Sequence, residues 1–161
     1  MAREAPPRNP LESLLGYQLR RVSAALMAAL GRDLDAIGLR PAEASILMLI
    51  GANPGITQSE LGRELGIQRA NMAPLAGSLE RRLLIARTPL NGRSHGLVLT
   101  EAGTRLRAEV EATMQAHELA IEQSLAAPAR EELRVTLGSL WRDLREGEST
   151  SGSAILPSDE R

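Results

Sequence analysis

Two helical segments joined by only three residues are the feature that most restricts how this chain can fold. Residues 57–60 read Thr-Gln-Ser-Glu, in which the threonine hydroxyl and the glutamate carboxylate can each satisfy a free backbone N–H at a helix start. Gly66 ends this segment, and a second stripe with helical spacing follows, formed by Met72, Leu75, Leu79 and Leu83. The intervening Gly66-Ile67-Gln68 predicts the tight turn of a helix-turn-helix.

The apolar spacing changes after these two helices. Residues 85–88 and 96–99 are short runs compatible with β-strands, and the segment between them contains Asn91-Gly92, a pair common in hairpin turns. A helix-turn-helix followed by a two-stranded hairpin is a winged helix. We expect this domain to occupy residues 41–100, with Pro41 in the first turn of its first helix.

Helices are also expected on both sides of the winged domain. Apolar residues spaced three and four apart from Leu11 to Ile37 predict one long amphipathic helix within residues 11–40, and residues 101–146 predict two more. These stripes exceed what the small winged domain can cover, so we expect an obligate homodimer. The predicted fold class is mainly α with a small β-hairpin wing, preceded by a flexible arm (1–10) and followed by a disordered tail (147–161).

Composition excludes several kinds of chemistry. The 161 residues include no Cys, which excludes disulfides, thiolate zinc sites and cysteine nucleophiles. His95 is expected in a turn and His117 at an interface, and no catalytic motif is present, so we expect neither metal, cofactor nor enzymatic activity. No run approaches the ~20 apolar residues that span a bilayer, and the N-terminus lacks a signal-peptide run. We expect a cytoplasmic protein with no membrane partner.

The charge is unevenly distributed along the chain. All 19 basic residues are Arg, and the formal net charge is −1. Residues 1–40 and 41–95 each carry six Arg against four acids, whereas residues 96–161 carry seven Arg against twelve acids. The near-neutral total therefore hides an acidic C-terminal third and does not exclude a nucleic-acid partner.

The second helix of the pair has an outward face that is small and nearly uncharged. A helical wheel places Ala70, Pro74, Gly77 and Arg81 opposite the apolar stripe, with Asn71 and Ser78 on the flank. Solvent-exposed helix surfaces usually carry more charge, whereas a small face suits insertion into a DNA major groove, where Asn71 can pair with adenine. Pro74 requires either that the helix begins after Arg69 or that it bends.

The expected partner is double-stranded DNA. Arg93 at the hairpin tip is a candidate for the minor groove, the alternative being a solvated turn. Other arginines and Gln58 are candidates for phosphate contacts. The complete expected DNA-binding set is Gln58, Arg63, Gln68, Arg69, Ala70, Asn71, Pro74, Ser78, Arg81, Arg82, Arg87, Arg93 and Ser94. The alternative function is a dimeric helical interaction module whose winged domain docks a partner protein.

The order of these elements, together with three stretches of sequence, resembles the MarR family over residues 11–145. The stretches are Thr-Gln-Ser-Glu-Leu-Gly-Arg-Glu-Leu-Gly (57–66), Leu-Glu-Arg-Arg (79–82) and Asn-Gly-Arg-Ser…Leu-Val-Leu-Thr-Glu-Ala-Gly (91–103). The resemblance implies a bacterial or archaeal dimeric regulator, usually a repressor, that binds a pseudo-palindromic operator and is released by a small aromatic or phenolic compound. The chain departs from the family in having Asn91 in place of a usual Asp and Leu83 in place of a common Gly.

The same resemblance places an effector pocket where the dimer helices meet the winged domain. Tyr17, Arg20 and Arg21 on the first helix would suit an aromatic carboxylate or phenolate, because Arg binds carboxylates through two parallel hydrogen bonds. The alternative is that Tyr17 packs in the dimer core and both arginines are solvated or paired with acids of the C-terminal helices.

Overall fold

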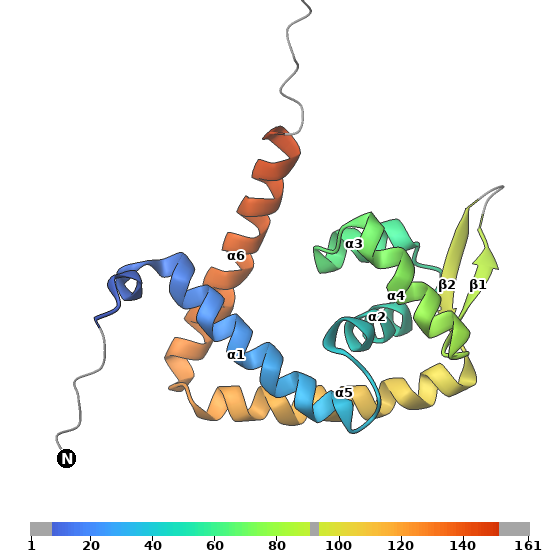
Figure 1. The fold of residues 1–161 in the computed structure, drawn as a ribbon, viewed down its shortest axis with the longest axis horizontal. Coiled ribbons are helices and arrows are strands. Elements are labelled where there is room, and N and C mark those ends of the chain that lie inside the picture. Colours follow the sequence, from blue (N-terminus) through green and yellow to red (C-terminus); the bar gives the residue numbers. More distant parts are fainter. Residues whose placement is uncertain (1–7, 91–93, 152–161) are drawn as a thin grey trace, which may run out of the picture. The chain divides into compact units, whose positions relative to one another are not determined.

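A computed structural model describes residues 8–90 and 94–151, with side chains up to residue 145. It divides into two compact units, Met1–His117 and Glu118–Arg161, which are described separately. The elements, shown in Figure 1, are η1 (Pro10–Ser13), α1 (Leu15–Asp35), α2 (Pro41–Ala52), α3 (Gln58–Leu65), α4 (Arg69–Arg81), β1 (Ile85–Pro89), β2 (His95–Leu99), α5 (Glu101–Gln123) and α6 (Ala127–Ser151).

The first unit contains the predicted winged helix-turn-helix. Strands β1 and β2 pair antiparallel, in a register that runs from Ile85 opposite Leu99 to Pro89 opposite His95. A single apolar core joins the end of α1 to α2, α3, α4, the hairpin and α5. Its largest fully buried side chains are Leu34, Leu39, Ile46, Leu47, Ile50, Leu61, Met72, Leu79, Leu97 and Val110. The predicted fold class, mainly α with a β-hairpin wing, is confirmed.

The start of α3 is the capping box that the sequence predicts. The backbone N–H of Glu60 donates to Thr57 Oγ1 at 3.2 Å, and the backbone N–H of Thr57 donates to Glu60 Oε2 at 2.8 Å. The bonds that the Glu60 carboxylate accepts from Thr57, from its backbone N–H first and from its hydroxyl second, hold the pKa of that carboxyl below its usual range. At the other end of α3, Gly66 is left-handed (φ 64°). Both ends of α3 are therefore fixed locally: the capping box fixes its start, and Gly66 fixes its end, where the tight turn begins.

A second local constraint lies where the hairpin meets α5. Thr100 Oγ1 lies 2.6 Å from the carbonyl oxygen of Leu83 and accepts the backbone N–H of Gly103 at 3.0 Å. A Cβ at Gly103 would overlap the Leu84 carbonyl, so only glycine fits. Leu83 itself is left-handed (φ 57°) with a side chain 73% exposed. The turn keeps a conformation that glycine adopts without strain, although Leu occupies it.

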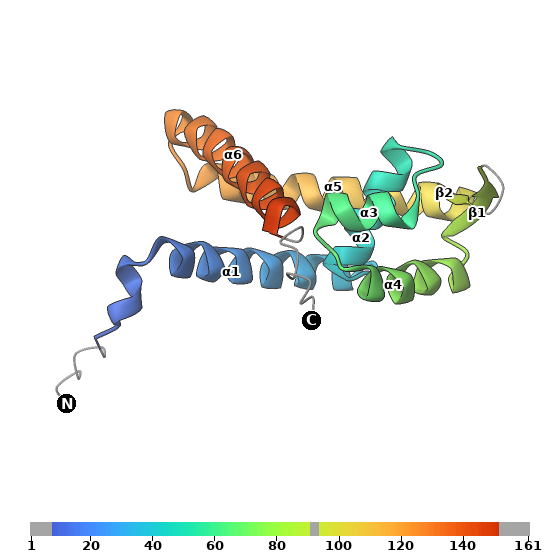
Figure 2. The same cartoon turned by 90° about the horizontal axis from the view of Figure 1, so that it is seen from above.

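The structure corrects two of the predicted element boundaries and answers the open question of where α4 begins. The predicted single helix from Leu11 is interrupted, because Pro10–Ser13 form η1, capped by Asn9, and Leu14 is extended before α1 begins (Figure 2). The predicted tail does not start at residue 147, since α6 continues to Ser151. The helix α4 begins at Arg69 with Pro74 inside it, so it does not start later. Residues 1–7 of the predicted arm (1–10) and residues 152–161 of the predicted tail (147–161) lie outside the described residues.

The second unit comprises the end of α5 and α6. Its two segments are linked by Glu122, whose carboxylate lies 3.4 Å from Arg130 Nη1 and 3.8 Å from Arg134 Nη2. Several large apolar side chains of α6 are exposed: Leu133, Val135, Leu137, Trp141 and Leu144. Within the described residues, no helix combines the length and apolar character needed to cross a bilayer.

We predict that replacing Leu83 by Gly stabilises the protein. The substitution removes the steric cost of a left-handed residue, and the greater freedom of glycine in the unfolded chain offsets part of that gain. The expected increase in the free energy of unfolding is roughly 0.5–1 kcal/mol, measured by urea denaturation. The matched control, Leu83→Ala, removes the exposed side chain but keeps a Cβ, and it should show no such gain. Equal gains in both variants would contradict the explanation.

Candidate nucleic-acid interface

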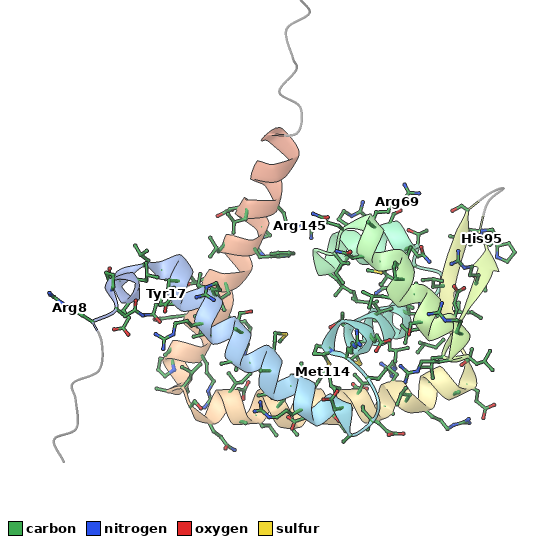
Figure 3. The ribbon with its side chains drawn as sticks, in the orientation of Figure 1. Arg8, Tyr17, Arg69, His95, Met114 and Arg145 are labelled. Carbon is green, nitrogen blue, oxygen red and sulfur yellow. The ribbon has the colours of Figure 1, made fainter. Side chains whose placement is uncertain are left out.

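The helix α4 presents an exposed, small-residue face at its N-terminal half. Gln68 is the N-cap residue, and the following Arg69, Ala70, Asn71 and Pro74 are exposed. Figure 3 shows Arg69 at the solvent-facing start of the helix. The opposite side is buried through Met72, Ala76 and Leu79. This division agrees with the helical-wheel prediction for these positions and leaves a face that a groove can accommodate.

Two residues predicted to contact DNA have partners within the protein instead. The hydroxyl of Ser78 donates to Glu43 Oε1 at 3.1 Å. Arg82 Nη2 donates to the carbonyl oxygen of Gly38 at 3.0 Å, and its Nη1 lies 3.7 Å from Glu43 Oε1. Sequence reasoning missed Glu43, because no local pattern connects it to Ser78, which lies 35 residues later in the chain, or to Arg82.

Arg87 on β1 is also engaged within the domain. Its Nε donates to Glu80 Oε1 at 2.6 Å and its Nη2 to Glu80 Oε2 at 3.0 Å, which is a bidentate pair. Hydrogen bonds from Arg87 lower the pKa of the Glu80 carboxyl, and the same bonds raise the pKa of Arg87. The pair connects α4 to β1 of the wing. It neutralises much of the Arg87 charge that was predicted to face a phosphate.

The remaining predicted contacts differ in their exposure. Gln58 is half-buried, and its Nε2 is buried with no hydrogen-bond partner among the described residues. Arg63 and Arg81 are exposed, and Arg63 Nε lies 4.0 Å from Glu64 Oε1. Ser94 is exposed, with its carbonyl accepting the N–H of Leu90 at 3.0 Å. Arg93 lies outside the described residues.

The predicted effector residues form one cluster on α1. The guanidinium carbons of Arg20 and Arg21 lie 5.1 and 5.6 Å from the centre of the Tyr17 ring, within cation–π range. Asn9 Nδ2 donates to the Tyr17 hydroxyl at 2.9 Å, and Arg21 Nη1 lies 3.8 Å from Glu12 Oε1. The structure thus brings the three residues together. Asn9 and Glu12 also contact this cluster, and they can do so because of the η1 turn, which the sequence did not predict.

These features define a class of protein. A capped helix, a tight turn, a second helix with an exposed small-residue face and a hairpin are the parts of a winged helix-turn-helix DNA-binding domain.

Comparisons with known proteins identify the family. A MarR family model matches residues 37–94. The transcriptional repressor CouR, solved bound to a 23-mer DNA duplex, is 32% identical with a TM-score of 0.78, and the match covers 84% of this chain and 98% of that one. The MarR family protein Rv2887 of Mycobacterium tuberculosis, in complex with p-aminosalicylic acid, is 30% identical with a TM-score of 0.65 and coverages of 80% and 98%.

A curated relative supports the same assignment. The putative transcriptional regulatory protein for the hcr operon of Thauera aromatica is 28% identical over 131 residues, which are 80% of this chain and 79% of the relative. The chain belongs to the MarR family. It is a DNA-binding transcriptional regulator and not an enzyme.

We predict that the Glu80–Arg87 pair contributes stability that acid removes. Because the pKa of Glu80 is lowered in the folded state, its contribution is complete above the unfolded-state pKa and is lost as the pH falls through the folded-state pKa. Below about pH 5, the unfolding free energy of wild type should therefore fall more steeply than that of Glu80→Gln. Urea denaturation across this range measures the difference. The control is Glu131→Gln, at an exposed carboxylate, whose unfolding free energy should fall with pH as steeply as that of wild type. A fall as shallow as that of Glu80→Gln would contradict the prediction.

Proposed function

We propose that the protein is a homodimeric repressor that binds a pseudo-palindromic operator and is released by a small aromatic acid. The observation that carries the proposal is the exposed small-residue face of α4, Arg69–Pro74, beside a hairpin wing. Such a face admits close approach of the helix to base edges in a major groove. The structure of CouR with a DNA duplex supports DNA as the partner, since that protein is similar over most of its length.

The proposed base contacts come from the start of α4. Gln68, Arg69 and Asn71 supply donors and acceptors, while Ala70 and Pro74 supply apolar contacts such as those made with a thymine methyl. Arg63 and Arg81 are exposed and are assigned to phosphates. Arg93 and Ser94 on the hairpin are assigned to the flanking minor groove. Gln58, Ser78, Arg82 and Arg87 are not assigned to DNA, because their polar groups are buried or paired within the protein.

Exposed apolar side chains on the flanking helices support the homodimer. In the first unit, Leu15 is 72% exposed and Val22 is 55% exposed on α1. In the second unit, Val135 and Leu144 on α6 are 58% and 60% exposed. Large apolar side chains exposed on helices in this way mark an interface, and two subunits would place two α4 helices on successive half-sites of one operator.

The effector site is proposed at Tyr17, Arg20 and Arg21. A phenol ring flanked by two guanidinium groups suits an aromatic carboxylate, which can stack on the ring and accept hydrogen bonds from Arg. Relatives support an aromatic ligand: Rv2887 has been solved with salicylic acid, an aromatic carboxylate, and CouR with p-coumaroyl-CoA, a phenolic thioester. An effector of this kind changes DNA affinity only through its different affinity for the free and DNA-bound forms.

We predict that Asn71→Ala reduces sequence preference rather than general DNA affinity. Loss of a bidentate contact to adenine should cost roughly 1–3 kcal/mol on the duplex that wild type selects from a random pool, and little on unrelated DNA. Fluorescence anisotropy with both duplexes measures the two affinities. Arg63→Ala is the matched control, since loss of a phosphate contact should weaken both affinities alike and lower the salt dependence. Equal losses on both duplexes for Asn71→Ala would show that Asn71 reads no base.

We predict that salicylate releases wild type from its selected duplex and releases Arg21→Ala about tenfold less effectively, because a charge-assisted hydrogen bond is lost. Tyr17→Ala should also require more salicylate. The control is Arg32→Ala, an exposed position about three turns further along α1. Titration of the bound complex measures release. Unchanged release in both Tyr17→Ala and Arg21→Ala would remove these residues from the effector site.

A further inference from the structure

Glu43 is a buried carboxylate in contact with the helix that carries the proposed base contacts. It is the third residue of α2 and is 7% exposed. Its Oε2 accepts the backbone N–H of Arg40 at 3.1 Å, and its Oε1 accepts the hydroxyl of Ser78 at 3.1 Å. Arg82 Nη1 lies 3.7 Å from the same Oε1. We call Glu43, Ser78 and Arg82 the Glu43 network.

Removing a carboxylate from water is costly, and an apolar side chain of similar size would often fill such a position equally well. The property that the carboxylate adds is direction. The rest of the contact between α2 and α4 is apolar, through Met72, Ala76 and Leu79, and apolar packing restrains rotation of a helix about its axis less tightly than hydrogen bonds do. The bond from Ser78 to Glu43 therefore adds a directional restraint on α4.

The same side of α4 also borders an open pocket. A pocket of about 530 Å³ is lined by Pro74, Leu75 and the Glu43 network on one side and by the α1–α2 connection on the other. Along the pocket, α4 is separated from the α1–α2 connection, whereas elsewhere it packs against α2, α3 and β1. Arg82 crosses this region to donate to the carbonyl oxygen of Gly38, so a polar contact joins the C-terminal end of α4 to the α1–α2 connection.

The geometry of a helix relates this restraint to DNA reading. Ser78 and Asn71 are seven residues apart, which places them on nearly the same side of α4, about 20° apart. A restraint at Ser78 therefore acts on the side of α4 that carries Asn71.

We propose that Glu43, Ser78 and Arg82 are positioning residues that fix the rotation of α4 and thereby the sequence preference of the regulator. They do so without touching DNA. The inference depends on the proposed function, because it assigns these residues an effect on base reading at α4.

The first test compares Ser78→Ala, Ser78→Thr and Glu43→Gln. The readout is the ratio of affinities for the duplex that wild type selects from a random pool and for unrelated DNA of the same length. Ser78→Ala should lower this ratio about fivefold to tenfold, as expected for one lost hydrogen bond. Ser78→Thr keeps the hydroxyl and should restore the ratio. The dependence of affinity on salt should stay that of wild type, because no phosphate contact is removed.

A double variant distinguishes positioning from direct contact with DNA. If Ser78 acts through Glu43, then Glu43→Gln lowers the ratio too, and the combination with Ser78→Ala lowers it no further than the larger single effect. Independent losses that add in the double variant would overturn the proposal. So would a ratio that is unchanged in Ser78→Ala.

A matched control separates positioning from loss of stability. Val110→Ala removes a fully buried side chain of α5 and should destabilise the same unit without changing a bond to α4. Its ratio should equal that of wild type, and a loss equal to that of Ser78→Ala would overturn the proposal. Wild type that selects no duplex from the pool would instead overturn the proposed function, so the two failures are distinguishable.

Discussion

The contact of Thr100 and Gly103 with the backbone at Leu83 and Leu84 is the constraint on which the arrangement of the winged domain depends. The N–H of Thr100 donates to the Leu84 carbonyl at 3.1 Å, and its hydroxyl binds at Leu83 while capping α5. The end of α4, the start of β1, the end of β2 and the start of α5 thus meet at one place. Because Gly103 lacks a Cβ, the start of α5 can pack directly against the backbone at Leu84.

This contact gives a physical reason for the most specific part of the sequence resemblance. The Leu-Thr-Glu-Ala-Gly stretch at 99–103 contains both residues that make the contact, the threonine and the glycine. Once this end of α4 is fixed, the Glu43 network and the Glu80–Arg87 pair act on its two flanks. The N-terminal half of α4 is then the part that remains free to face a partner.

Sequence reasoning predicted those features that depend on residues close together in the chain. The capping box joins Thr57 to Glu60, and Asn91-Gly92 lies between two runs that pair as β1 and β2. The helical wheel correctly separated Met72 from Ala70 because burial follows the helical period. The break between η1 and α1 was missed, because Leu11, Leu14 and Leu15 fit one helical period although Leu14 is extended.

The partners of polar residues are harder to predict, because a helical wheel gives direction and not partners. Ser78 lies on the predicted flank, yet what it faces is a carboxylate 35 residues away. Charge makes Arg82 and Arg87 candidates for phosphate contacts, whereas in the structure Arg82 binds at Gly38 and Glu43 and Arg87 pairs with Glu80. No pattern in the sequence pairs such residues before the fold brings them together.

The distance along the chain between the members of the Glu43 network also has a consequence for the order in which the protein folds. The Ser78–Glu43 and Arg82–Gly38 bonds span 35 and 44 residues, whereas the α3 cap spans three. Closing a long loop costs more entropy than closing a short one, so contacts between distant residues form late. We therefore expect the cap to form early and the Glu43 network to form once α2 and α4 have docked. Interactions that are absent from the folding transition state act mainly on the rate of unfolding. The Glu43 network, which sets the rotation of α4, therefore acts on the rate at which the folded domain unfolds and not on the rate at which it folds.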